Sequence, residues 1–98
     1  MKARWTGLAL RRLRQLHDHI ALDQPLNAQR FVDRLTRHAS EAAHRPEIGR
    51  VVPEFQRDDV REVFEGAYRL IYRVTDDGID VLTVRHGARL MPARLQDL

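Results

Sequence analysis

Cysteine is missing from this sequence, lysine occurs once, and there is no long apolar run. The absence of cysteine excludes disulfides and thiolate metal sites, so the 98 residues have to fold through side-chain packing alone. No apolar run comes near the roughly 18 residues that cross a bilayer, which excludes a transmembrane helix. The five histidines show no metal-binding spacing, and we predict neither a metal nor a cofactor.

What is present is the composition of an ordinary soluble globular protein, with 43% hydrophobic and 32% charged residues. A chain of this length can form one modest core, so we expect a single domain over residues 1–98. The first segment, MKARWTGLALRRLRQL, has arginines where a signal peptide needs an unbroken apolar region. The sequence therefore predicts a cytoplasmic protein.

The positive charge is carried by 16 arginines and one lysine, and it is unevenly distributed. Residues 1–45 contain nine Lys or Arg against four Asp or Glu, whereas residues 46–98 contain eight against ten. The basic surface is therefore expected in the first half. Such a surface suits an acidic partner or a nucleic acid, and it is equally typical of a solvated face.

The first half has the periodicity of two amphipathic helices. Thr6 is a suitable N-cap for a first helix ending near Leu22, and Trp5 before it either packs as a staple or ends a short strand. Pro25 suits the first turn of a second helix over about 25–43. The apolar positions that define the two faces are Ala9, Leu13, Leu16 and Ile20, then Ala28, Phe31, Leu35, Ala39 and Ala42. The short connection predicts an antiparallel helical hairpin over about 6–43.

The second half has the signals of short strands. RVVPEF, VREVF and AYRLIYRV are rich in β-branched and aromatic residues and are separated by Asp, Gly and Gln. Pro53 cannot donate to a ladder, so its strand is expected at an edge or with a bulge. We predict an α+β fold in which the helical hairpin packs on a small twisted antiparallel sheet over about 49–87, followed by a tail over 88–98.

The segment YRLIYRVTDDGIDVLTVRHGAR, residues 68–89, predicts a hairpin whose register decides where its arginines point. A two-residue turn at Asp77-Gly78 would mix arginines with apolar residues on both faces. A three-residue loop, Asp76 to Gly78, separates the faces, and we prefer it. It places Tyr68, Leu70, Tyr72, Val74, Leu82, Val84 and His86 against the helices. It leaves an open face with Arg69, Arg73, Arg85, Thr83, Ile71, Ile79 and Val81.

Arginines on an open sheet face have two explanations. They keep the face soluble, or they bind a partner through forked hydrogen bonds to carboxylate or phosphate. Lysine or glutamate would serve solubility as well, so the use of arginine alone favours binding.

Four motifs in this order resemble the ParE/RelE superfamily of bacterial toxins from type II toxin-antitoxin systems. They are GRVVPEF (49–55), VREV (60–63), YRLIYRV (68–74) and VLTVRHGAR (81–89), preceded by a tryptophan and a helical hairpin ending in RPEIGR. The resemblance covers nearly the whole chain. It implies a helical hairpin on a small antiparallel sheet, a role in plasmid stabilisation, and a cognate antitoxin whose flexible segment orders on the toxin in a hetero-oligomer.

The superfamily divides by activity: RelE-like members cleave mRNA on the ribosome, and ParE-like members are associated with inhibition of DNA gyrase. Cleavage would use Arg69 and Arg85 to hold the phosphate and His86 to move protons. This chain has no tyrosine after Tyr72 and its only lysine is Lys2, which departs from the RelE pattern. The VRHGAR ending resembles the ParE branch, in which His86 would close the end of a core-facing strand, hydrogen-bonded to backbone.

We therefore expect a non-enzymatic gyrase inhibitor first, a ribosome-dependent endoribonuclease second, and a degenerate member that binds its antitoxin without toxicity third. The predicted partner-binding residues are Arg11, Arg12, Arg14, Arg69, Arg73, Arg85 and Arg89. Gly49, Arg50, Pro53 and Glu54 are expected to shape the entry into the sheet, and Arg61-Glu62 to supply a cross-strand ion pair.

Overall fold

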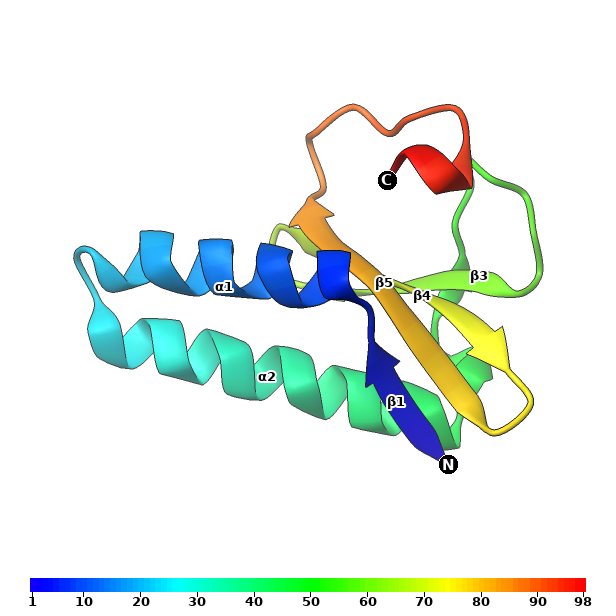
Figure 1. Ribbon diagram of the computed structural model, residues 1–98, viewed down its shortest axis with the longest axis horizontal. Coiled ribbons are helices and arrows are strands. Elements are labelled where there is room, and N and C mark those ends of the chain that lie inside the picture. Colours follow the sequence, from blue (N-terminus) through cyan, green and yellow to red (C-terminus); the bar gives the residue numbers. More distant parts are fainter.

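The computed structural model describes all 98 residues and has two layers, a helical hairpin and a five-stranded sheet (Figure 1). The elements are β1 (Lys2–Trp5), α1 (Gly7–Ala21), α2 (Pro25–His44), β2 (Arg50–Val51), β3 (Val60–Glu65), β4 (Tyr68–Thr75) and β5 (Gly78–His86), with short 3-10 helices η1 (Pro46–Ile48) and η2 (Leu95–Asp97). The predicted α+β class is confirmed.

The two helices begin and end close to the predicted residues. The Thr6 side chain caps α1 by accepting a hydrogen bond from the Ala9 amide at 3.1 Å, and Pro25 occupies the first turn of α2. The helices run side by side and extend beyond the sheet at one end (Figure 1). Neither is both long and apolar enough to span a membrane.

The main core lies between the hairpin and the sheet. All five predicted α2 positions are buried, and the alanines among them let α2 lie close to the strands. The α1 stripe of Leu13, Leu16 and Ile20 is only half-buried, because it packs at the margin of the core. The sheet contributes Leu70, Tyr72, Ile79, Val81 and Val84.

The strand order is β1-β5-β4-β3-β2, in which β2 to β5 pair antiparallel as predicted. The first strand, β1, adds a parallel edge beside β5. Gly78 makes this pairing possible: its φ is +151°, and a Cβ there would lie 1.9 Å from the Lys2 carbonyl oxygen. Trp5 thus ends a strand, one of the two roles expected for it.

The predicted register of the β4–β5 hairpin is right for one half and wrong for the other. Far from the turn, Arg69 lies opposite Arg85 as expected. Near the turn, the loop is the two residues Asp76 and Asp77, and an irregularity between Ile71 and Tyr72 takes up the extra residue. This bulge turns Ile79 and Val81 toward the helices and Leu82 away from them, so each half of the strand buries its aliphatic side chains.

The sheet face away from the helices, called the second face below, is not open as predicted. Val52, Val60 and Ile71 form a small second core on it, against which Met91, Leu95 and Leu98 pack from the C-terminal tail. Figure 1 shows the tail arching over the strands from the end of β5 and finishing in η2. The arginines under this cover are therefore buried rather than exposed.

Candidate functional site: a pair of buried arginines

Arg69 on β4 and Arg85 on β5 lie directly opposite each other on the second face. Alternation along the strands places them there, on the same side as Ile71 and Thr83. Arg69 is 5% exposed and Arg85 is 6% exposed. Two buried guanidinium groups side by side repel each other and lose hydration, so each needs compensation from its surroundings.

Arg69 is fully compensated by two carboxylates. Its Nη1 and Nη2 donate to the two oxygens of Glu54 at 2.9 and 2.8 Å, and its Nε donates to Glu62 Oε1. The forked bond from Arg69 lowers the pKa of Glu54 to about 2, and the same bonds raise the pKa of Arg69. Arg69 is thereby held as a cation, and each of its three nitrogens already donates to a carboxylate.

Glu62 is the central acid of this network and is 1% exposed. Its second oxygen accepts a hydrogen bond at 2.7 Å from Arg50, the residue opposite it on β2. The cross-strand ion pair predicted for Arg61-Glu62 is therefore present at Glu62, which pairs with Arg50 on β2 and Arg69 on β4, but not at Arg61, which points to the opposite face. Arg61 instead donates to the backbone oxygens of Gly49 and Asp58, at 2.9 and 3.0 Å.

Arg85 has no carboxylate partner. Its guanidinium makes one hydrogen bond, from Nη2 to the Leu90 carbonyl oxygen at 2.9 Å, and its Nε is buried without any partner. Burial is the main cause that lowers the pKa of Arg85, followed by the charges of Arg89, Arg69 and Arg12. A buried donor left unpaired costs about 1 to 3 kcal/mol. The Arg85 Nε is the one buried side-chain nitrogen or oxygen that has no hydrogen-bond partner.

A pocket of about 210 Å³, called the Arg85 pocket below, opens beside this guanidinium. Arg89 lines it with a second positive charge, and Asp97, which also lines it, is paired with Arg94 at 3.0 Å. The remaining walls are apolar: Leu90, Met91, Pro92 and Leu98. The pocket therefore combines unbalanced positive charge with an apolar lining.

His86 lies beside Arg85 in the sequence but on the other side of the sheet. Its ring stacks edge-on against Tyr68 with centroids 5.3 Å apart, and its Nδ1 accepts a hydrogen bond from the Ala88 amide at 3.1 Å. This is the backbone-bonded position at the end of a strand that the sequence suggested. His86 and the two arginines do not converge on one point.

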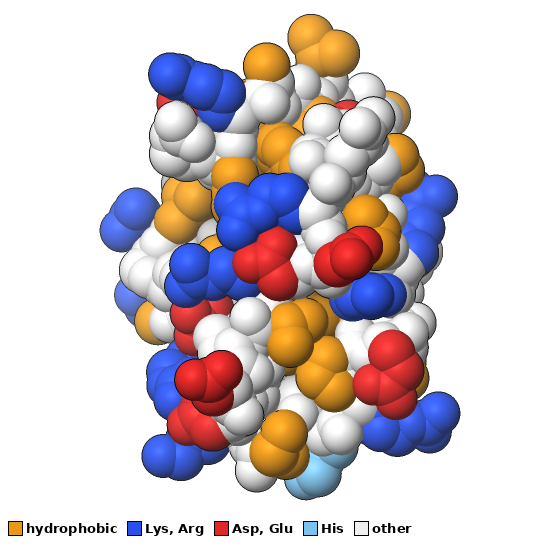
Figure 2. Space-filling view, turned by 90° about the vertical axis from the view of Figure 1, so that its right-hand side faces the viewer, with side chains coloured by type: hydrophobic (Ala, Val, Ile, Leu, Met, Phe, Trp, Pro, Cys, Tyr) orange, Lys and Arg blue, Asp and Glu red, His pale blue; other side chains and the backbone are white.

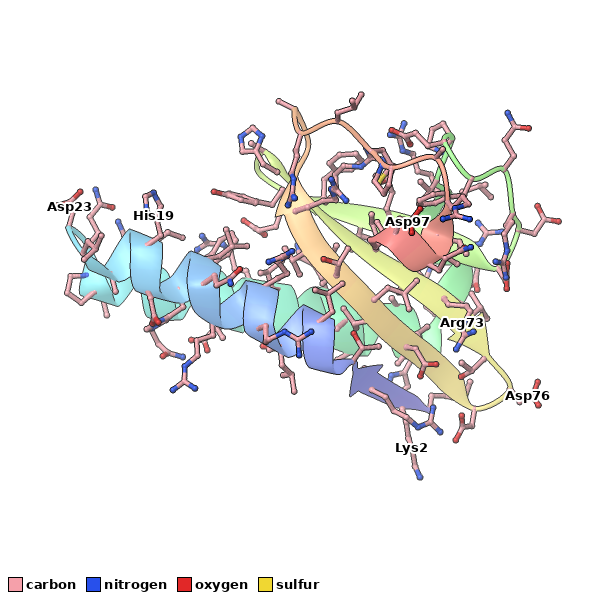
Figure 3. The ribbon with its side chains drawn as sticks, turned by 45° about the horizontal axis from the view of Figure 1, so that its top comes forward. Lys2, His19, Asp23, Arg73, Asp76 and Asp97 are labelled. Carbon is pink, nitrogen blue, oxygen red and sulfur yellow. The ribbon has the colours of Figure 1, made fainter.

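The other predicted binding arginines are dispersed. Arg73 is exposed, forms an ion pair with Asp80 at 2.8 Å and lies toward the β4–β5 turn (Figure 3), whereas Arg85 lies near the other end of β5. Arg11 and Arg14 are exposed on α1, whereas Arg12 is half-buried and close enough for its charge to affect Arg85. Basic and acidic side chains intermingle on the side that carries the turn (Figure 2). Of the predicted set, only Arg12, Arg85 and Arg89 gather around one site, with Arg69 beside it.

Sequence reasoning did not find Glu54 and Glu62 as partners of Arg69. A signal for Glu62 was present, because it alternates with Val60 and Phe64 on one face of β3, and an acid between apolar residues on a covered face needs a cation. For Glu54 there was none, since it lies in a turn 15 residues from Arg69. Only the folded chain brings those two side chains together.

The architecture defines the class of this protein: a small α+β domain with a helical hairpin on one sheet face and two buried arginines on the other. A family model described as the ParE toxin of type II toxin-antitoxin systems, parDE, matches residues 3–91. The chain belongs to this family.

Two known proteins are similar to the chain over most of its length. Toxin RelE2 of Caulobacter vibrioides (strain ATCC 19089 / CIP 103742 / CB 15) is 36% identical over 86 residues, covering 88% of this chain and 94% of the relative. A solved structure described as the chromosomal ParDE TA system from P. aeruginosa aligns with a TM-score of 0.72 at 20% identity, covering 88% of this chain and 95% of that one. The second likeness concerns the fold alone. The resemblance to the ParE/RelE superfamily is confirmed.

Proposed function

We propose that this toxin acts in the cytoplasm as one domain that binds and inhibits DNA gyrase, and that a cognate antitoxin neutralises it in a hetero-oligomer. The single observation that favours binding over catalysis is the state of Arg69. Each of its three nitrogens already donates to Glu54 or Glu62 and the residue is 5% exposed, so its charge is committed to the fold and a substrate phosphate would have to compete with two carboxylates.

RNA cleavage through a 2′-hydroxyl needs a base, an acid and a cation converging on one phosphate. Here Arg85 and His86 point to opposite faces of β5, and the His86 ring nitrogen nearest the backbone is engaged by the Ala88 amide. A phosphate held by Arg85 would therefore lie across the sheet from the only histidine on the strand. This arrangement supports a protein-binding toxin over a nuclease.

An antitoxin partner is supported by the family and by the distribution of charge. The helical half carries nine basic against four acidic residues, and Arg11 and Arg14 project from α1 without an ion pair. A segment rich in acidic and apolar residues would complement this surface. Binding of such a segment would also order it, which is typical of flexible partners.

The test is a DNA supercoiling assay with purified gyrase, run beside an mRNA cleavage assay on programmed ribosomes, with toxin freed from its antitoxin. The proposal expects loss of supercoiling and intact mRNA. A matched His86→Ala variant should inhibit gyrase as the parent does.

Cut mRNA with unaffected gyrase, abolished by His86→Ala, would establish the RelE-like activity instead. If neither target responds while the antitoxin still binds, the chain is a degenerate member.

A further inference from the structure

The Arg85 pocket combines two features that a protein interior ordinarily avoids. Its central guanidinium is 6% exposed, and its Nε has no hydrogen-bond partner. Fully buried arginines are otherwise paired with carboxylates, as Arg69 is. The neighbouring carboxylates are engaged elsewhere. Both oxygens of Glu54 and both oxygens of Glu62 bind other arginines, and Asp97, which lines the pocket, pairs with Arg94.

The one partner that Arg85 does have is weakly held in place. The Leu90 carbonyl belongs to a stretch of the tail in which residues 90–93 make no backbone–backbone hydrogen bond. Leu90 is 91% exposed, so little packing holds it in place. A neutral carbonyl therefore occupies a position where an anion would bind more strongly.

We propose that the Arg85 pocket receives one carboxylate carried by a peptide segment of the antitoxin, which replaces the Leu90 carbonyl and pairs with Arg85 and Arg89. This inference rests on the proposed antitoxin partner and names its anchoring contact. The carboxylate supplies the missing acceptor for the Arg85 Nε, and the fork of the guanidinium suits its two oxygens. The alkyl part of an Asp or Glu side chain then lies against Met91 and Pro92.

The lining favours a carboxylate on a peptide over a nucleic-acid phosphate. Single-stranded RNA is held by aromatic side chains on which its bases stack, and no aromatic residue lines this pocket. The pocket is also small, at about 210 Å³, and about half of its lining is apolar. One side-chain carboxylate fits such a site better than a sugar-phosphate backbone does.

The first arm of the test needs no antitoxin. Toxin labelled with ¹⁵N-arginine is titrated with sodium acetate, with sodium chloride at equal ionic strength, and with dimethyl phosphate, while the arginine Nε–Hε signals are followed by NMR. Acetate should shift the Arg85 and Arg89 signals saturably and leave Arg57 unchanged. A response equal to that of chloride, or tighter binding of dimethyl phosphate, overturns the proposal.

The second arm measures antitoxin affinity by calorimetry for the parent, Arg85→Gln and the control Arg57→Gln. Arg57 is an exposed arginine paired with Asp59 and lies away from the pocket. Arg85→Gln should weaken binding roughly 30-fold or more and Arg57→Gln less than about threefold. Circular dichroism confirms that each variant is folded, and Arg85→Lys, which keeps the charge without the fork, should also lose affinity.

The third arm finds the partner carboxylate. Each Asp and Glu of the antitoxin's toxin-binding segment is changed to its amide and combined with Arg85→Gln in a double-mutant cycle. For one acid, the loss of affinity in the double variant should differ from the product of the two single losses by about tenfold or more. If the parent binds the antitoxin and every cycle is additive, this inference fails and the proposed function stands. If the parent binds no antitoxin, the antitoxin part of the proposed function fails and the acetate titration still decides whether the carboxylate site exists.

Discussion

Arg69 and Arg85 make a natural comparison, because they face each other across β4 and β5 and are equally buried. Arg69 donates three hydrogen bonds to two carboxylates, and Arg85 donates one to a backbone carbonyl. The pKa of Arg69 is raised by its partners and that of Arg85 is lowered by burial. The same residue type in the same layer thus serves the fold in one position and remains available for a partner in the other.

The largest effect is expected from Arg69→Met. It leaves Glu62 buried and charged with only the exposed Arg50 as a partner, so the free energy of unfolding should fall by about 3 to 5 kcal/mol. Urea unfolding monitored by circular dichroism measures it. The double variant Arg69→Met/Glu62→Met should recover most of the loss, and failure to do so would mean that the network does not depend on this pair.

Arg85→Met should have the opposite effect on stability. It removes a desolvated cation and an unpaired Nε at the cost of one hydrogen bond, so the free energy of unfolding should rise by about 1 kcal/mol. The same urea titration applies, with Arg57→Met as an exposed control. A loss of stability comparable to that of Arg69→Met would erase the contrast between the two arginines.

The stability contributed by Glu54 should depend on pH. Its pKa is about 2 in the folded chain, below the ordinary value of 4.5, so the unfolded chain takes up the proton first. The stabilisation is complete above about pH 5 and is lost as the pH falls toward 2. Because 38% of the Glu54 side chain is exposed, we expect about 1 kcal/mol. Urea midpoints from pH 6 to pH 2 for the parent and Glu54→Gln should converge at the acid end.

The smallest effect is expected from Arg50→Met. Arg50 binds the same Glu62 as Arg69 does, but 56% of its side chain is exposed. Water replaces much of what is lost, so the free energy of unfolding should change by less than about 1 kcal/mol. Arg50 also lies over the Phe64 ring at 5.1 Å, a contact that methionine partly retains. An effect as large as that of Arg69→Met would show that burial does not rank these ion pairs.

Much of the fold follows from patterns that the sequence displays. The α1 and α2 stripes, the Thr6 cap, Pro25 in the first turn of α2 and the four antiparallel strands were all predictable, because each depends on spacing within one segment. The parallel β1 and the bulge at Leu82 were not. Both depend on how two separate segments meet, and a shift of one residue moves Ile79 and Val81 from one face to the other.

The sequence by itself determined that arginines alternate with aliphatic residues on β4 and β5, and hence that Arg69 and Arg85 share a face. Only the tertiary structure decided what that sharing means. Glu54 reaches Arg69 from a turn, Glu62 from β3, and the tail closes over Arg85 while its Asp97 pairs with Arg94 instead. Periodicity is a property of one strand, whereas charge compensation depends on distances between segments that approach each other only in the folded chain.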